Sequence, residues 1–198
     1  MLTIYWIIIG SAAVAIGAAI LGVWLRKNPS QENAEKSSRV MHFLFFAGQV
    51  APPIVGLFYP GFKQLDHLVG LQPLPWMLLF LPLGILLAIP GFYFLSVTNR
   101  LLRALGSGTN AFILTKRVVS DDIYKRTRNP MSLGFYLLAL GTAFIAGSTF
   151  ATLAVALGII PSHLLFLKFF EEKELELRFG ESYLEYKKSV PFLVPRIS

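Results

Sequence analysis

The chain has 198 residues, of which 55% are hydrophobic and only 15% charged, and its mean hydropathy is +0.61. A soluble domain of this size carries nearer a quarter charged residues, so the composition excludes an ordinary soluble domain and predicts an integral membrane protein. The net charge of +7 does not predict a nucleic-acid partner, because the basic residues flank apolar blocks, where membrane lipids and membrane orientation account for them. The absence of cysteine excludes disulfides and thiolate metal sites.

Five apolar blocks approach or exceed the roughly 20 residues needed to cross the hydrocarbon core. We therefore predict an all-α bundle of five transmembrane helices, at about residues 2–25, 40–62, 74–98, 130–147 and 149–168. The first block begins at Leu2 without a preceding basic residue and is too long for a signal-peptide core, so we interpret it as a retained span. The last two blocks are joined at Gly147-Ser148 and should form a tight helical hairpin.

Polar segments separate these blocks and indicate the orientation of the chain. Residues 26–39 are expected to be a polar loop, and with five spans every lysine and arginine except Lys63 falls on one side of the membrane. The positive-inside rule then predicts an outside N-terminus and a cytoplasmic C-terminal tail. We expect two parts: residues 1–98 with three spans, and residues 99–198 with a cytoplasmic loop, the hairpin and a helical tail that folds against the loop and carries the active site.

Prolines and small residues predict how the spans are shaped and packed. Helix kinks are expected at the prolines inside the spans, which are Pro52, Pro53, Pro82, Pro90 and Pro161. Close helix contacts are expected at the small residues of the first and fourth spans, which are Ala13, Gly17, Ala18, Gly22, Gly134 and Gly141.

The sequence Arg128-Asn129-Pro130 stands at the start of the fourth block. Asn is a favoured N-cap and Pro suits the first helical position, so these residues can simply begin a helix, with Arg128 as a membrane anchor. A helix N-terminus also presents free amide groups and a positive dipole end to an anion. Arg128 adds a bidentate donor for a carboxylate or phosphate. Both interpretations remain open on the residues alone.

An acidic pair, Glu171-Glu172, directly follows the last span. We expect it near a helix C-terminal end or a bend, where acids are unfavourable, and the following residues 170–179 to be helical until Gly180 stops them. The pair can be a solvated charged face. Alternatively, one carboxylate holds a cationic ligand or accepts a proton.

Other polar motifs predict no site. The sequence at 106–108, Gly-Ser-Gly, lacks the third glycine and the preceding strand of a dinucleotide fingerprint. The three histidines, His42, His67 and His163, have no metal-ligand spacing, so no metal is expected, and we interpret His163 as a packed or hydrogen-bonded residue.

Three elements together resemble the isoprenylcysteine carboxyl methyltransferase family, which belongs with the phospholipid methyltransferases in a broader membrane group. They are IYKRTRNPMSLG before the hairpin, the Glu pair after it, and FGESYLEYKKSVP in the tail, so that the resemblance covers roughly residues 118–195. The family motif is Arg-His-Pro-x-Tyr-x-Gly. Here Asn129 stands for the His, Ser132 for the Tyr, and Asp122 for the Gly usual two residues before Tyr124. Asn hydrogen-bonds but does not titrate near neutral pH, so at this position a cofactor-binding role survives and an acid–base role does not.

The resemblance implies S-adenosylmethionine as methyl donor, bound on the cytoplasmic side. It assigns catalysis and substrate placement to Arg128, Glu171 and Glu172, and cofactor binding to Tyr124, Asn129, Pro130 and Tyr183. The acceptor should be amphiphilic, a small molecule or lipidated substrate with its tail among the spans and membrane lipids around it. The sequence does not specify the oligomeric state.

Two kinds of acceptor fit these residues. A carboxylate needs only orientation, which suits Arg128, whereas a protonated lipid amine needs a base, which suits Glu171 or Glu172. The tail motif favours an isoprenylcysteine-like carboxylate. A phospholipid N-methyltransferase and a non-enzymatic membrane protein on the same scaffold are the alternatives. Membrane sterol-type reductases share a related hairpin motif but are much longer chains.

Overall fold

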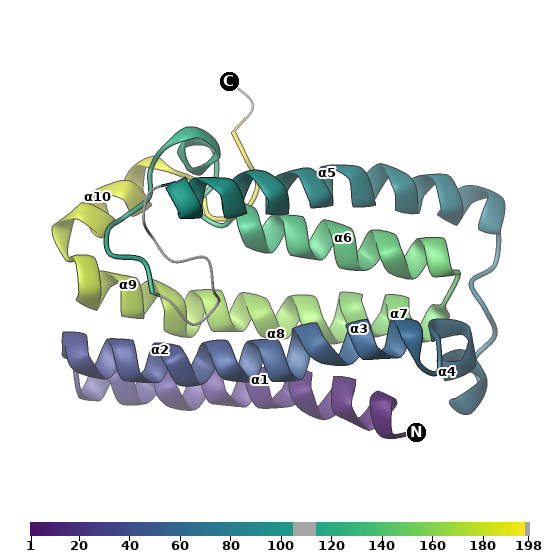
Figure 1. Cartoon of the computed structure of the whole chain (residues 1–198). Helices are drawn as coiled ribbons and strands as arrows, with labels where there is room; N and C mark the ends of the chain where they lie inside the picture. Colours follow the sequence, from purple (N-terminus) through teal and green to yellow (C-terminus); the bar gives the residue numbers. More distant parts are fainter. Residues whose placement is uncertain (105–113, 197–198) are drawn as a thin grey trace.

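The computed structural model describes residues 1–104 and 114–196, which form a bundle of long helices lying side by side (Figure 1). Four helices are long and apolar enough to cross a membrane: α1 (Leu2–Lys27), the continuous helix Gln31–Phe58, α5 (Met77–Ala104) and the continuous helix Thr149–Phe179. A fifth apolar helix, α6 (Pro130–Ala146), has 17 residues. The described residues contain no strand. The predicted all-helical membrane bundle is therefore confirmed.

Two of the long helices contain π-helical turns, where the hydrogen-bond ladder widens by one residue. The first, Gln31–Phe58, consists of α2 (Gln31–Phe45), η1 (Phe46–Val50) and α3 (Ala51–Phe58). The second, called here the long C-terminal helix, consists of α7 (Thr149–Leu153), η3 (Ala154–Ile159), α8 (Ile160–Leu165), η4 (Phe166–Glu171) and α9 (Glu172–Phe179). Three short elements complete the described fold: α4 (Phe62–Leu68), the 3₁₀ turn η2 (Asp122–Lys125) and α10 (Glu181–Ser189).

The polar stretch after α1 is helical, so the loop expected at residues 26–39 is wrong. Only residues 28–30 separate α1 from α2, and Ser30 caps α2 by accepting a hydrogen bond from Asn33 N at 3.1 Å. Helix α2 is amphipathic: one face is buried, made by Ala34, Ser37, Ser38 and Met41. This face packs against α1 and α9, so tertiary contact stabilises as helix a segment whose composition alone is typical of a loop.

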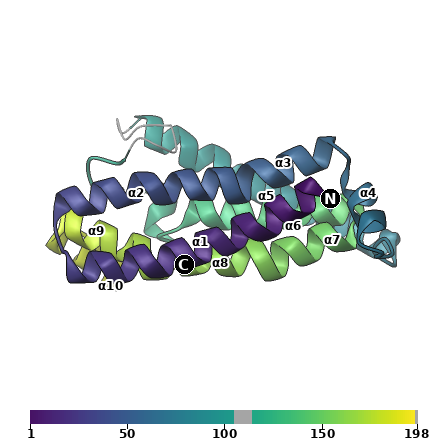
Figure 2. The ribbon, with the colours of Figure 1, turned by 90° about the horizontal axis from the view of Figure 1, so that it is seen from below.

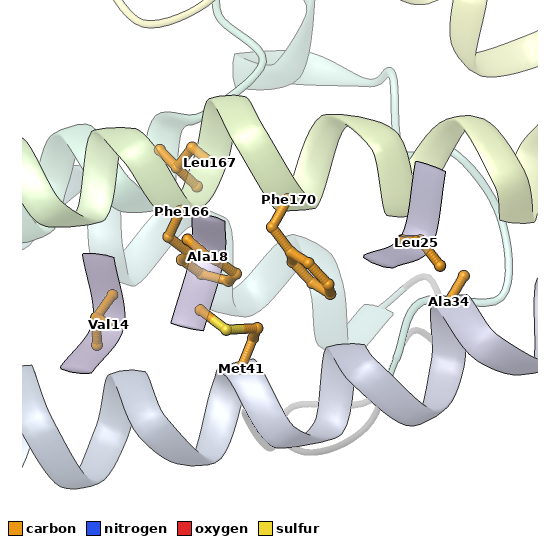
Figure 3. Packing of buried hydrophobic residues seen from close by; sticks show 8 residues of the cluster. All are labelled: Val14, Ala18, Leu25, Ala34, Met41, Phe166, Leu167 and Phe170. Carbon is orange, nitrogen blue, oxygen red and sulfur yellow. The ribbon is translucent and has the colours of Figure 1, made fainter. Parts of the chain in front are cut away.

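Helix α1 packs against both the helix Gln31–Phe58 and the long C-terminal helix, and it crosses them obliquely (Figure 2). The contact between these three helices is filled by a buried apolar cluster (Figure 3), made by Val14, Ala18, Leu25, Ala34, Met41, Phe166, Leu167 and Phe170. Phe166 and Phe170 are among its largest members and are almost completely buried. Because both residues belong to η4, this cluster fixes the long C-terminal helix just before Glu172.

The hairpin between α6 and the long C-terminal helix turns within two residues, as predicted. Gly147 has φ = 66°, the left-handed conformation that a glycine adopts without strain. Ser148 caps the following helix by accepting from Ala151 N at 3.1 Å. Asp66 of α4 is fully buried and holds the turn from the other side, because its Oδ1 accepts from Phe150 N at 2.6 Å and from Ser148 Oγ at 3.1 Å.

The helices α5 and α6 approach each other so closely that their backbones touch. Gly84 faces Gly141 and Gly91 faces Gly134, and a Cβ atom built on Gly91 would lie 2.5 Å from Leu138 N. The close packing expected from Gly134 and Gly141 is thus present, and its partners are glycines of α5. This contact holds α5 against α6 along their length.

Replacing Gly91 with alanine should therefore destabilise the protein. The new Cβ has backbone atoms within 3.0 Å and forces α5 and α6 apart, so we expect a loss of about 1–3 kcal/mol, read as a lower melting temperature of the purified protein in detergent. Gly158→Ala is the matched control, because its nearest atom would be Ser11 Oγ at 3.5 Å. Equal melting temperatures for the two variants would contradict this account of the interface.

Candidate active site

The residues singled out in the sequence meet at one end of the bundle, where α9 and α10 lie (Figure 1). The segment before α6 runs against the C-terminal tail there. Arg128 N donates to Pro191 O at 2.9 Å, Arg196 N donates to Arg126 O at 3.1 Å, and the buried Thr127 donates through Oγ1 to Leu193 O at 2.8 Å. These bonds hold the start of α6 beneath the tail, as expected for a loop that folds against it.

Asn129 and Pro130 occupy the first positions of α6, and Asn129 ties α6 to the tail. Pro130 is the first helical residue. The Asn129 side chain caps no helical amide; its Nδ2 instead donates to Phe192 O at 2.9 Å. The expected helix start is therefore correct. The expected side-chain cap is absent, because the Asn129 side chain hydrogen-bonds to the C-terminal tail instead. The sequence contains no signal for this exchange, because the partner is 63 residues away.

Arg128 and Glu172 form an ion pair across 44 residues of sequence. The Arg128 Nη1 atom lies 3.0 Å from Glu172 Oε1, and the side chains are 7% and 11% exposed. Arg128 Nε donates to Val190 O at 3.1 Å, and Nη1 also reaches the hydroxyl of Tyr183 at 3.5 Å. The fold thus brings together Arg128, one residue of the acidic pair and Tyr183, as the resemblance implied.

Glu172 is the centre of a cationic cluster. Besides Arg128, it accepts from Lys168 Nζ at 3.0 Å and from Lys187 Nζ at 2.7 Å. Burial alone would lower the pKa of Lys187, but its hydrogen bonds to Glu172 and Glu176 raise that pKa above the usual value and keep the ammonium charged. Arg128, Lys168 and Lys187 all contact the Glu172 carboxylate, and Lys187 also pairs with Glu176 at 3.0 Å, so these three cations outnumber the two carboxylates that they contact.

Glu171 differs from its neighbour in having no such partners. It closes η4, and Glu172 begins α9 without a break, so the expectation that the pair lies near a helix end or bend is wrong. The π-turn and the apolar cluster below it keep the helix continuous. Across the described ranges, the Glu171 carboxylate has no hydrogen bond or ion pair, while it interacts electrostatically with Tyr124, Tyr136 and Tyr183. π-Turns of this kind are frequent at functional sites.

Two tyrosines beside Glu171 supply neutral hydroxyl groups. Burial raises the pKa of both Tyr124 and Tyr183 well above the usual tyrosine value, and the charge of Glu171 adds to that rise. The Tyr124 backbone is held by Tyr186, whose hydroxyl donates to Tyr124 O at 2.8 Å. Tyr124 and Tyr183 therefore stay protonated over the physiological range and can donate hydrogen bonds beside an acidic group.

Sequence reasoning missed several residues of this site. Lys168 precedes Glu172 by one helical turn, a spacing that predicts an ion pair, and its ammonium also lies 3.8 Å from the centroid of the Phe192 ring. No sequence pattern marks Lys187 or Phe192 as site residues, because only the folding of the C-terminal tail brings them to the site. The sequence at 106–108 lies outside the described residues. Within the described ranges, no group of three or more His, Asp or Glu side chains is placed to hold a metal ion.

Removing the Glu172 charge should weaken the fold. Glu172→Gln leaves Arg128 and Lys168 without their shared carboxylate in a largely buried cluster, so we expect a loss of about 3 kcal/mol, measured by thermal unfolding in detergent. Glu185→Gln on the exposed face of α10 is the control and should leave the melting temperature unchanged. A Glu172→Gln protein as stable as wild type would mean that the cluster is not structural.

Comparison with known proteins fits this geometry. Residues 79–182, more than half of the chain, match the phospholipid methyltransferase family. A protein-S-isoprenylcysteine O-methyltransferase of Schizosaccharomyces pombe is 37% identical over 86 residues, which is 40% of this chain and 34% of that protein. Methanethiol S-methyltransferase 2 of Bradyrhizobium diazoefficiens is 38% identical over 76 residues, 38% of this chain and 27% of that protein. The matches thus span about a third or less of these relatives.

No solved structure matches the chain. The family match includes α6, the hairpin, Arg128 and Glu172, and therefore contains both partners of the ion pair. The chain belongs to the phospholipid methyltransferase family, the membrane group that includes the isoprenylcysteine carboxyl methyltransferases.

Proposed function

We propose that the protein is a membrane methyltransferase that takes its methyl group from S-adenosylmethionine and transfers it to an amphiphilic acceptor. The observation that carries this proposal is the contrast between the two neighbouring acids. Glu172 is neutralised by three cations, whereas Glu171, one residue earlier, has no ion-pair partner among the described residues. A ligand with separate positive and negative groups suits such a site.

The residues present fit the cofactor. Its sulfonium and ammonium groups are cationic, and Glu171, with the neutral hydroxyls of Tyr124 and Tyr183 beside it, would hold them. Its carboxylate suits Lys168, which shares Glu172 with two other cations and is the most exposed of the three. When bound, the cofactor supplies an activated methyl group. The protein then has to align the acceptor and exclude water, which is the main requirement of an in-line displacement.

Arg128 would orient the acceptor. Its Nε and Nη1 are used within the protein, but Nη2 has no hydrogen bond within the described ranges and is free to donate. Glu172 and Val190 O fix the guanidinium plane, so Glu172 acts as the residue that positions Arg128. A fixed guanidinium donor at a net positive site favours an acceptor carboxylate such as that of an isoprenylcysteine. A lipid amine is the alternative, favoured by the unpaired Glu171, which can serve as its base.

Methyl transfer should depend on Glu171. We expect purified wild-type protein in detergent to transfer radiolabelled methyl from S-adenosylmethionine to prenylcysteine analogues in preference to phosphatidylethanolamine. Binding of S-adenosylhomocysteine should raise the melting temperature of the wild-type protein. Because Glu171→Gln removes the carboxyl group facing the cofactor, kcat/KM should fall at least about tenfold. The melting temperature without ligand should hardly change, since this carboxylate has no protein partner to lose.

Glu185→Gln is the matched control, an exposed acid outside the site, and should transfer methyl at the wild-type rate. Absence of both ligand stabilisation and methyl transfer in the wild type would refute the enzymatic proposal. Full activity in Glu171→Gln would refute its role. Preference for phosphatidylethanolamine would assign the enzyme to lipid amines instead.

We also propose that the site faces the cytoplasm and the N-terminus lies outside. In the described residues, Lys63 of α4 lies at the end of the bundle opposite the basic cluster around Arg128 (Figure 1), which is the charge asymmetry of the positive-inside rule.

The chain has no cysteine, so single introduced thiols can test this orientation cleanly. In intact cells, a membrane-impermeant maleimide should label an exposed Lys63→Cys protein and spare Glu185→Cys. After permeabilisation, both should react. The reverse pattern in intact cells would invert the proposed orientation.

A further inference from the structure

A second polar contact joins α6 to the long C-terminal helix, deeper in the bundle than the ion pair. The hydroxyl of Tyr136 lies 3.0 Å from His163 Nδ1, and the two residues are 5% and 4% exposed. Polar and ionisable side chains within membrane helices are costly and usually serve a function. The methyl-transfer steps above make no use of this pair.

The pair lies on the same side of the hairpin as the proposed active site. Tyr136 follows Ser132 by four residues, so the two project from the same face of α6, about 6 Å apart along its axis. Arg128 directly precedes this helix. On the facing helix, His163 precedes Glu171 by eight residues. Glu171 also interacts electrostatically with Tyr136. Two contacts therefore join the helices of the hairpin on this side: Arg128 with Glu172, and Tyr136 with His163. In sequence, Ser132 and Glu171 lie between these two contacts.

His163 is held rigidly by aromatic rings. It stacks on Phe45 with ring centroids 4.2 Å apart and on Phe166 at 5.4 Å, and the edge of Phe135 approaches at 6.0 Å. Tyr136 has no other hydrogen-bond partner in the described part of the chain. A phenol both donates and accepts one or more hydrogen bonds, so when His163 donates from Nδ1, the phenol O–H is left to donate to a ligand.

We propose that Tyr136 is a specificity-determining residue that donates a hydrogen bond to an oxygen of the acceptor's reactive end, and that His163 is the positioning residue that aims it. The inference rests on the proposed methyl transfer and narrows its acceptor. The acceptor carries a hydrogen-bond-accepting oxygen, as a prenylcysteine carboxylate does. This oxygen lies deeper in the bundle than the Arg128–Glu172 ion pair.

Tyr136→Phe tests the inference, because it removes the hydroxyl and keeps the ring. Steady-state methyl transfer to a prenylcysteine analogue should show a KM for the acceptor raised about tenfold, the loss expected for one buried hydrogen bond. Stabilisation by S-adenosylhomocysteine should be unchanged, since the cofactor does not contact Tyr136 in this scheme. Tyr5→Phe is the matched control, which removes a phenol hydroxyl from an exposed position of α1 and should leave the acceptor KM unaltered.

His163 is tested by a pair of variants. His163→Phe removes the bond to Tyr136 and should raise the acceptor KM as Tyr136→Phe does, whereas His163→Gln keeps a hydrogen-bonding partner and should restore most of the loss. If Tyr136→Phe is unstable, the His163 pair supplies the same KM measurement. A merely structural pair would lower the melting temperature and leave the acceptor KM at the wild-type value, which would overturn the inference.

Failure of the proposed function has a different signature. A wild-type protein without methyl transfer to any acceptor would remove the enzymatic basis and the inference with it. An active wild type whose KM survives both Tyr136→Phe and His163→Phe would overturn the inference alone.

Discussion

The ion pair between Arg128 and Glu172 is the interaction on which the site depends. It joins the start of α6 to the long C-terminal helix at the end of the hairpin that is not closed by a turn. A buried guanidinium and carboxylate are costly to desolvate and are stable only when both are fully paired. Here Lys168, Lys187 and the backbone of the tail complete that pairing. The same contacts fix the direction in which Arg128 can donate.

The rest of the bundle sets the geometry of this pair. The hydrogen bonds to the C-terminal tail place Arg128, and the apolar cluster around Phe166 and Phe170 places the acidic residues. At the opposite end, Gly147 and Asp66 lock the turn. With both ends fixed, the two helices hold the contact between Tyr136 and His163 between them, and they hold Glu171 without an ion-pair partner among the described residues.

The two acids, Glu171 and Glu172, are neighbours in sequence but have different surroundings in the fold. Successive residues of a helix project about 100° apart, and the π-turn ending at Glu171 changes the local register. Glu172 consequently faces the cationic cluster, whereas Glu171 faces tyrosines and has no ion-pair partner among the described residues. One acid of a Glu-Glu sequence is thus paired with cations, while its neighbour keeps no ion-pair partner among the described residues.

The sequence predicted part of the site correctly because local rules act there. Pro130 begins α6, Gly147 ends it and Gly180 ends α9, each through its own backbone preference. The polar stretch around Ala34 was misjudged because its helix depends on contact with α9. The bond from Asn129 to Phe192 and the arrival of Lys187 were unpredictable for the same reason: their partners are remote in the sequence.

By itself, the sequence determined that this chain is a bundle of apolar helices with a hairpin near its C-terminus, and its motifs pointed to Arg128 and the acidic pair. These conclusions follow from hydropathy, helix-terminating residues and short motifs, all of which act over a few neighbouring positions. Only the tertiary structure decided which acid is paired, which groups remain free, and that Tyr136 meets His163 inside the bundle. Those outcomes depend on the register between helices, which packing of glycines and aromatic rings sets.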